Sequence, residues 1–305
     1  MSTDTALRTD PIIASGGQLS PSRRLWRITS KERQFQIGLI VLILLVGVAV
    51  IYPHLTSMSV TKMSIRERFM PPLFLPGGQW AHPLGTDQLG RDLFLRALVG
   101  LQNALMIGVA SVVLMFTFGS VLGLISGYYG GWVDTVLMRI TDTQLAVPLI
   151  ILAITILTVH RPTPESVTLV LALSGWPGYA RVTRSVALSE RSREYVRGAK
   201  ILGASDFRII FQLIAPNVLP PIAFVAVLDI ARMMIFEAVL GFIGIGVQPP
   251  TPTFGNIISD GQKYLINAWW IATMPGVFLL LTLLSVNLIG TSIEQARNKV
   301  LGGTA

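Results

Sequence analysis

The sequence predicts an all-α membrane protein with six transmembrane helices. Of its 305 residues, 51% are hydrophobic and only 13% are charged, whereas soluble domains carry about 25% charged residues. Long uncharged apolar runs recur along the chain, and a helix needs about 20 such residues to cross roughly 30 Å of hydrocarbon. The alternation of apolar and polar residues that marks a half-buried strand is absent from the sequence.

The first predicted span covers residues 36–52 and is centred on the apolar run Ile37–Ile51. A cleaved signal peptide is the alternative interpretation. The segment 1–35 is too long for the basic region of a signal peptide, and no Ala-x-Ala cleavage site follows. We therefore expect an uncleaved span after a cytoplasmic tail. Residues 1–22 of that tail, rich in Ser, Thr, Gly and Asp, are expected to be disordered.

The next three spans are predicted at Ala104–Tyr128, Thr143–Val159 and Val167–Ala180. The second span contains no charge, and small residues at regular intervals suit close helix packing. These small residues are Gly108, Ser111, Gly119, Gly123 and Gly127. The fourth span contains Trp176-Pro177-Gly178, and its proline is expected to bend or end the helix.

The fifth and sixth spans are predicted at Val218–Phe236 and Ala268–Ile289, the last opening with Trp269-Trp270 at a membrane interface. Residues 53–101 then form a periplasmic segment, 102–291 the transmembrane core, and 292–305 a cytoplasmic tail.

The positions of basic residues predict the orientation in the membrane, because cytoplasmic segments are enriched in Lys and Arg. One basic cluster precedes the first span: Arg23, Arg24, Arg27, Lys31 and Arg33. Another lies between spans four and five: Arg181, Arg184, Arg191, Arg193, Arg197, Lys200 and Arg208. An even number of spans places both clusters and both termini in the cytoplasm. The net charge of +8 then needs no nucleic acid partner.

The segment at about 190–215, between spans four and five, is predicted to form a cytoplasmic hook of two short helices. Tyr195, Val196, Ala199 and Leu202 recur at helical spacing and define one apolar face. Gly203 stands where a helix C′ glycine belongs, and Ser205 can cap a second helix that ends before Pro216. The periodicity suits insertion into a groove of another protein and attachment to the lipid surface equally well.

The sequence offers no catalytic group or metal site. Cysteine is absent, and His54, His82 and His160 are scattered without metal-binding spacing. No phosphate-binding loop occurs, so any ATP chemistry belongs to another chain. Gly85-Thr86-Asp87 could hold Ca²⁺ or a substrate, but a turn stabilised by the Asp side chain is the favoured interpretation.

Two charged residues lie near the middle of the fifth predicted span. Asp229 and Arg232 are three residues apart and therefore share one side of a helix. A charge at that depth costs at least about 2.5–3.5 kcal/mol on insertion scales and usually faces a partner or a water-filled path. Two interpretations of this pair stay open: a structural ion pair at a helix interface, and a contact with the transported solute.

Several motifs resemble the C-type permease subunit of the dipeptide/oligopeptide/nickel ABC importer family, over roughly residues 35–290. One is the segment Ala81–Asp92 before the second span, and another is Gly246–Pro252. The Glu-Ala-Ala frame of ABC permeases falls on Arg197-Gly198-Ala199, with Gly203, Leu213 and Pro216 at the family's spacing. Arg197 replaces the glutamate of that frame. Further agreement comes from Gly127–Gly131, Asp134, Met138, Arg139, Asp142, Pro148, Trp176, Arg181, Arg184, Pro216-Asn217 and Glu237-Ala238.

The resemblance implies a type I ABC importer permease in the bacterial inner membrane, half of a pore completed by a B-type permease. A cytoplasmic coupling helix would dock two ATPase subunits, which use ATP and Mg, while this chain binds no cofactor. A periplasmic solute-binding protein would deliver a peptide-like solute; nickel, opine or oligosaccharide are the alternatives. A proton-coupled secondary transporter and an intramembrane enzyme rank behind. The implied docking residues are Tyr195, Val196, Arg197, Gly198, Ala199, Leu202 and Gly203; Asp229, Arg232 and Glu237 are assigned to the translocation path or an interface.

Overall fold

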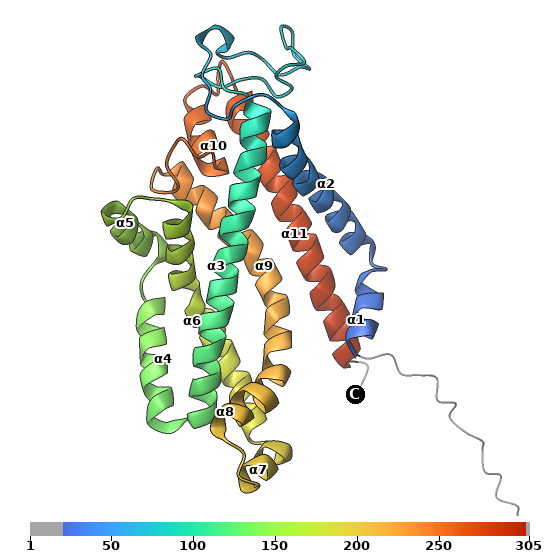
Figure 1. The fold of residues 1–305 in the computed structure, drawn as a ribbon, viewed down its shortest axis with the longest axis vertical. Helices are drawn as coiled ribbons and strands as arrows, with labels where there is room; N and C mark the ends of the chain where they lie inside the picture. The colour runs from blue at the N-terminus through green and yellow to red at the C-terminus, as the bar shows by residue number, and fades with distance from the viewer. Residues whose placement is uncertain (1–20, 303–305) are drawn as a thin grey trace, which may run out of the picture.

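The computed structural model describes residues 21–302, which form one elongated bundle of helices (Figure 1). These residues contain no β-strand, only an isolated bridge between Thr86 and Asp92, as the sequence predicts. The bundle is built mainly from α2 (Arg33–Leu55), α3 (Leu93–Tyr129), α4 (Gly131–Leu145), α5 (Leu149–Val159), α6 (Pro164–Arg191), α9 (Ala215–Phe242) and α11 (Trp270–Gly302). The remaining helical elements are α1 (Pro21–Thr29), η1 (Ile65–Glu67), α7 (Glu194–Ile201), α8 (Asp206–Arg208), η2 (Ile209–Ile214) and α10 (Phe254–Gln262).

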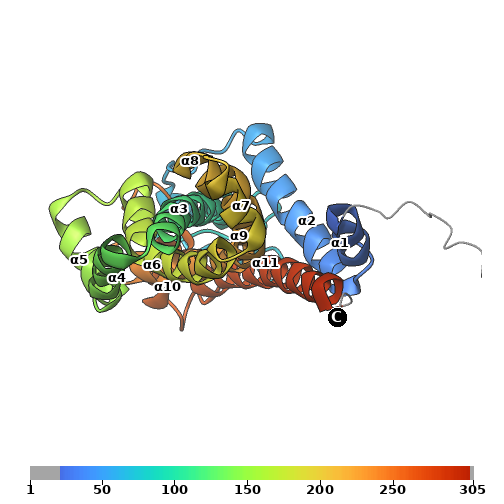
Figure 2. The same ribbon diagram turned by 90° about the horizontal axis from the view of Figure 1, so that it is seen from below.

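Helix length and apolarity mark α2, α3 and α11 as membrane spans within residues 21–302, together with the bent pair α4–α5 if that pair counts as one. The other two predicted spans correspond to α6 and α9. Each has 28 residues and is therefore about 42 Å long at 1.5 Å per residue. Both lie beside α3 in the bundle (Figures 1 and 2).

The third predicted span is not one straight helix. Residues from Thr143 to Val159 belong to two helices, α4 and α5, which meet at an angle of 84°. The break coincides with Pro148, which has an extended backbone before α5. A residue that precedes proline avoids the helical conformation. α4 accordingly ends at Leu145, and the chain turns over residues 146–148 before α5 begins.

The fourth span, in contrast, does not end at Pro177. The helix α6 continues through Pro177 to Arg191. Proline removes one backbone hydrogen bond, but Trp176 and Pro177 are buried against the rest of the bundle. Tertiary packing along α3 holds the helix on both sides of the proline.

The seam between α3 and α6 depends on glycines spaced four residues apart. A Cβ atom placed on Gly119 would lie 2.4 Å from the carbonyl oxygen of Trp176, and one on Gly123 would lie 2.5 Å from that of Ala180. Both distances are far shorter than a van der Waals contact. The two backbones approach so closely that only hydrogen fits between them, which confirms the predicted role of these glycines in helix packing.

The two ends of the bundle differ. The loop end, defined by residues 56–92 and α10, lies opposite the hook end, defined by α7, α8, α1 and the last turns of α11 (Figure 1). From below, α4 and α5 lie on one side, α1 and α2 on the other, with α3, α6 and α9 between them (Figure 2). The two ends of the described chain meet at the hook end, where Lys299 pairs with Glu32 at 2.6 Å.

The helices at both ends of the described chain reach into the segments that the sequence predicts as tails. Residues 1–20 lie outside the described residues, but Pro21 and Ser22 already belong to α1. At the other end, α11 continues past Ile289, where the predicted sixth span ends, to Gly302. Tertiary contacts explain the extension: the guanidinium of Arg297 donates to the Pro221 carbonyl oxygen of α9 at 2.9 Å.

Candidate functional site

The hook between α6 and α9 begins with α7 and turns sharply at Gly203. That residue has φ +79°, a left-handed conformation that glycine adopts without strain. Ser205 then caps the next helix, since its hydroxyl accepts a hydrogen bond from the backbone N–H of Arg208 at 3.4 Å. The glycine stop and the serine cap are confirmed.

The second helix of the hook does not end before Pro216, contrary to the prediction. It passes through the π-helical turn η2 directly into α9. Pro216 is the second residue of α9, and its fixed φ is compatible with a helix. The hook is therefore continuous with a membrane-crossing helix, so a displacement of the hook can pass directly into α9.

Tyr195 and Val196, which the sequence predicts to contact a partner protein, instead attach the hook to the rest of the bundle. Val196 is only 3% exposed and belongs to the main hydrophobic core. The Tyr195 hydroxyl donates to Glu190 Oε1 at 2.6 Å and accepts from Asn217 Nδ2 at 3.1 Å. The predicted single apolar face is therefore divided. Its first two members hold the hook in place, and Val196 is unavailable to another chain.

The exposed part of the hook is its far tip. Leu202 is 88% exposed, and the apolar side chains of Ile201 and Phe207 are exposed beside it in the sequence. Arg197 is exposed, and Gly198 and Ala199 are partly exposed. Sequence reasoning missed Ile201 and Phe207, although their position on either side of the Gly203 turn was a usable signal. An apolar tip of this kind is typical of a protein–protein contact.

A second candidate site is a groove of about 220 Å³ between α6 and α9, which contains Asp229 and Arg232. Arg232 NH2 lies 3.0 Å from Asp229 Oδ1, and the Tyr179 hydroxyl donates to Asp229 Oδ2 at 2.6 Å. Both carboxylate oxygens therefore have partners within the chain. The predicted pairing of Asp229 and Arg232 is present, and Tyr179 is a third member that the sequence did not indicate.

The two charges in this groove differ in accessibility. The Asp229 side chain is 15% exposed, whereas that of Arg232 is 56% exposed. Gly178 also lines the groove, and a side chain there would meet no atom within 4 Å. The groove is thus open on the side where Arg232 presents its guanidinium.

Glu237 does not belong to this groove. It is fully buried, and its carboxylate has no hydrogen-bond partner among the described residues. The adjacent part of α9 packs closely on the start of α10, since a Cβ on Gly255 would lie 2.3 Å from the Ala238 carbonyl oxygen. The structure therefore separates Glu237 from Asp229 and Arg232, with which it was grouped.

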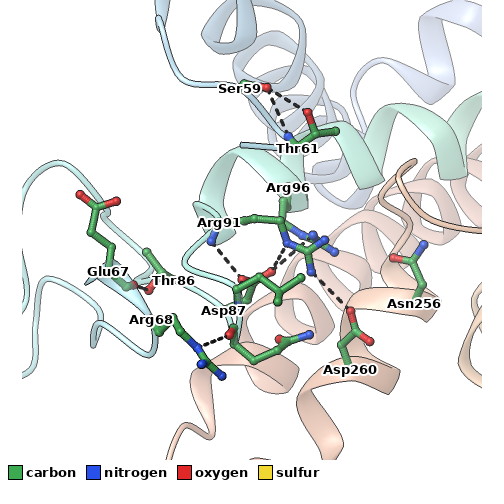
Figure 3. A network of polar contacts seen from close by, with 12 residues as sticks. Ser59, Thr61, Glu67, Arg68, Thr86, Asp87, Arg91, Arg96, Asn256 and Asp260 are labelled. Atoms are coloured by element: carbon green, nitrogen blue, oxygen red, sulfur yellow. Dashed lines mark hydrogen bonds and ion pairs between the residues drawn. The ribbon is translucent and has the colours of Figure 1, made fainter. Parts of the chain in front are cut away.

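At the loop end, a polar network joins the segment before α3 to α10 (Figure 3). Asp87 accepts from Arg91 Nε at 2.6 Å and pairs with Arg96 NH1 at 3.3 Å. Arg91 NH2 also lies 3.6 Å from Asp260 of α10. Asp87 Oδ1 accepts the backbone N–H of Leu89 at 2.8 Å, as in an Asx turn. The favoured interpretation of Gly85-Thr86-Asp87 as a turn is confirmed.

The three histidines form no metal site with other residues of the described chain, which contains no cluster of three or more metal-ligating side chains. His82 is instead part of the loop-end packing, since its Nδ1 lies 2.9 Å from Asp92 Oδ2. The other oxygen of Asp92 accepts the backbone N–H of Leu95 at 2.7 Å and caps α3. Burial is the main reason that the pKa of Asp92 is raised.

We expect Asp87→Asn to destabilise the loop end strongly. The change removes the carboxylate shared by two buried guanidinium groups, and loss of one partner of a buried ion pair costs about 3–5 kcal/mol. Thermal unfolding of the purified protein in detergent measures the effect. Asp260→Asn is the matched control, because Asp260 is more exposed and, among residues 21–302, forms one ion pair, with Arg91 at 3.6 Å. Equal unfolding temperatures for the two variants would contradict the structural role of Asp87.

The described residues thus form a helical bundle with a charged groove between α6 and α9 and an exposed apolar tip on the hook. The family described as binding-protein-dependent transport system inner membrane component matches residues 119–299. The chain belongs to this family. The match runs from within α3 into α11 and includes both the hook and the groove.

Relatives of known name match almost the whole chain. The dipeptide transport system permease protein DppC of Haemophilus influenzae is 34% identical, covering 91% of this chain and 94% of its own. The di/tripeptide transport system permease protein DppC of Pseudomonas aeruginosa is 33% identical, covering 94% of each chain. The DppC protein of Bacillus subtilis is 32% identical, with 91% and 85% coverage.

A solved structure shows the same fold. A chain of the MetNI methionine ABC transporter, in an inward-facing conformation, superimposes with a TM-score of 0.54 at 18% identity. The match covers 67% of this chain and 96% of the other. The predicted architecture of a type I ABC importer permease is thereby confirmed.

Proposed function

We propose that this chain forms one half of the path through which an ATP-driven importer carries a peptide-like solute across the membrane. Its relatives named as dipeptide and di/tripeptide permeases support a peptide solute. The single observation that carries the proposal is the hook. An exposed apolar tip at one end of the bundle is continuous, through η2, with a helix that lines a charged mid-span groove.

The tip of the hook is the docking site for an ATPase subunit. Isolated apolar side chains cost little at a surface, but Ile201, Leu202 and Phe207 gather around one tight turn. A groove on the ATPase would bury them, with Ala199 and Gly203 permitting close approach. ATP and Mg would bind to two such ATPase subunits, and this chain would bind neither.

The hook end faces the cytoplasm, together with both termini. The basic residues around α1 and those of the hook lie at this same end (Figure 1), and cytoplasmic segments are rich in Lys and Arg. The loop end then faces the periplasm of a bacterial inner membrane, where a solute-binding protein would deliver its cargo.

The open side of the α6–α9 groove faces a second, B-type permease across the solute path. Arg232 lies near the middle of α9 and is exposed in the isolated chain. An arginine facing lipid at that depth is costly, so such residues line interfaces or aqueous cavities. A partner permease on this side would enclose the groove and remove it from lipid.

We expect Leu202→Glu to prevent capture of the ATPase without unfolding the chain. The substitution places a charge in the apolar contact, and because Leu202 is exposed it loses no internal packing. The measurement is the amount of ATPase that co-purifies with the tagged permease pair, followed by ATP-dependent uptake in vesicles. The permease purified alone serves as the blank for ATP hydrolysis.

The matched control is Ile266→Glu at the loop end, where the residue is 96% exposed. It makes the same change from apolar to acidic at an equally exposed position. Normal ATPase capture by both variants would reject the tip as the docking site. Hydrolysis of ATP by the chain alone would reject the assignment of the ATPase to another subunit.

A further inference from the structure

A basic pocket of about 380 Å³ lies between the end of α6 and α7. Three cationic side chains line it: Arg191 from α6, and Arg197 and Lys200 from α7. Its apolar wall comes from Tyr128, Leu188 and Val196. The pocket is therefore built by three helices, because Tyr128 belongs to the end of α3.

The three cationic side chains of this pocket differ from nearby arginines in that they form no ion pair within the described residues. Arg181 and Arg184 on α6 pair with Asp142 and Asp134 of α4, and Arg193 pairs with Glu190 at 3.0 Å. Within residues 21–302, no hydrogen bond or ion pair engages the charged heads of Arg191, Arg197 and Lys200. Like charges gathered in one hollow repel each other, and an anion that enters would relieve this repulsion.

The pocket is suited to a side chain rather than to a bare ion. Its lining combines three guanidinium or ammonium groups with an aromatic ring and two aliphatic side chains. A glutamate or aspartate would place its carboxylate among the cations and its methylene groups against the exposed side chain of Leu188. Arginine can bind a carboxylate with two parallel hydrogen bonds.

The position of the pocket favours a protein partner over a lipid headgroup. Figure 1 shows α7 at the extreme tip of the hook end, beyond α1 and the end of α11. α1 carries the exposed Trp26, and tryptophan marks the membrane–water interface. The pocket also borders the apolar tip, since Arg197 and Lys200 share α7 with Ile201.

We propose that this basic pocket receives an acidic side chain of the ATPase subunit. The inference rests on the proposed function, and it specifies the chemistry of the contact. In this contact the side chains of the apolar tip become buried, and the pocket recognises a charge. Only an ATPase with a carboxylate at the matching position therefore docks well. Charge pairs of this kind favour the correct partner and penalise a wrong one.

The test is the affinity of the reconstituted permease pair for its ATPase. Arg197→Glu, which reverses one charge in the pocket, is expected to weaken binding at least tenfold. Lys31→Glu is the matched control, because Lys31 is an exposed cation at the hook end but does not line the pocket. Equal loss in both variants would overturn the proposal in favour of a general charge effect, as would unchanged affinity for Arg197→Glu.

A charge swap identifies the partner residue. The chain contains no cysteine, so Arg197→Cys provides a unique site for cross-linking to the assembled ATPase. An aspartate or glutamate at the cross-linked position, replaced by arginine, should restore the affinity that Arg197→Glu loses. Cross-links confined to segments without acidic residues, or failure of every such swap, would overturn the proposal.

The lipid composition of the vesicles distinguishes a protein partner from a lipid headgroup. Vesicles of neutral lipid and vesicles with anionic lipid should give the same tenfold difference between parent and Arg197→Glu. A difference that appears only with anionic lipid would overturn the proposal and assign the pocket to headgroups. If the parent pair captures no ATPase at all, the proposed function fails. If the parent binds and Arg197→Glu binds equally, only the acidic contact fails.

Discussion

Gly123→Leu is expected to leave little folded protein, because it forces α3 and α6 apart. A Cβ on Gly123 would lie 2.5 Å from the Ala180 carbonyl oxygen and 2.7 Å from Thr183 Cβ. Ordinary overpacking of a core costs about 1–3 kcal/mol, and here the obstacle is backbone that no rotamer change can move. We expect a loss above about 3 kcal/mol in the free energy of unfolding.

Gly47→Leu is the matched control for this substitution. Gly47 also lies within a membrane-crossing helix, α2, but a Cβ there would meet no atom within 4 Å. The measurements are the yield of monodisperse protein in detergent and its thermal unfolding temperature. Equal behaviour of Gly123→Leu and Gly47→Leu would show that the close approach of α3 and α6 is not required.

Arg232→Gln is expected to reduce ATP-driven uptake at least tenfold while the complex assembles at parental yield. The Tyr179 hydroxyl still donates to Asp229 in this variant, so the buried carboxylate keeps a partner. Asp229→Asn should lower the yield of complex as well as uptake, because it leaves the guanidinium of Arg232 without its anion at mid-span.

The double variant Asp229→Asn/Arg232→Gln distinguishes the two interpretations of the pair. A purely structural ion pair predicts that the double variant recovers both assembly and uptake, since no uncompensated charge remains. A solute-contacting Arg232 predicts recovery of assembly alone. We expect the second outcome, because Asp229 is held within the chain while Arg232 is exposed to the groove. Parental behaviour of all three variants would exclude both roles.

Asp229 and Arg232 have different roles in the groove. Asp229 positions Arg232 through a 3.0 Å contact, and Tyr179 positions Asp229 in turn. The exposed guanidinium can then meet an anionic group in the path, such as the carboxylate of a peptide-like solute. The prediction for Arg232→Gln therefore concerns transport, and the prediction for Asp229→Asn concerns transport and assembly together.

Much of the fold follows from local sequence. An uncharged apolar run of about 20 residues has few stable states other than a helix across a membrane, because lipid offers no hydrogen-bond partner to the backbone. α2, α3 and α11 were predicted for this reason. Gly203 and Ser205 were also predictable, since a left-handed turn and a helix cap require only their own residue types.

Other features were decided by contacts between distant segments. Pro177 interrupts the local pattern, yet α6 continues because α3 packs along it. Tyr195 and Val196 share a helical face with Leu202, but the bundle buries Val196 and binds the Tyr195 hydroxyl, whereas Leu202 is left exposed. Glu237 shares α9 with Asp229, but α10 covers its part of the helix, and no sequence period indicates this.

The sequence by itself determined the class of protein, the helical spans and the turn of the hook, because backbone hydrogen bonding and apolar burial act over neighbouring residues. The tertiary structure alone decided which charged and apolar side chains face a partner. Arg191 lies at the end of one helix and Arg197 within another, and Tyr128 is more than 60 residues earlier in the chain. Their convergence on one pocket depends on how α3, α6 and α7 pack, which no local pattern encodes.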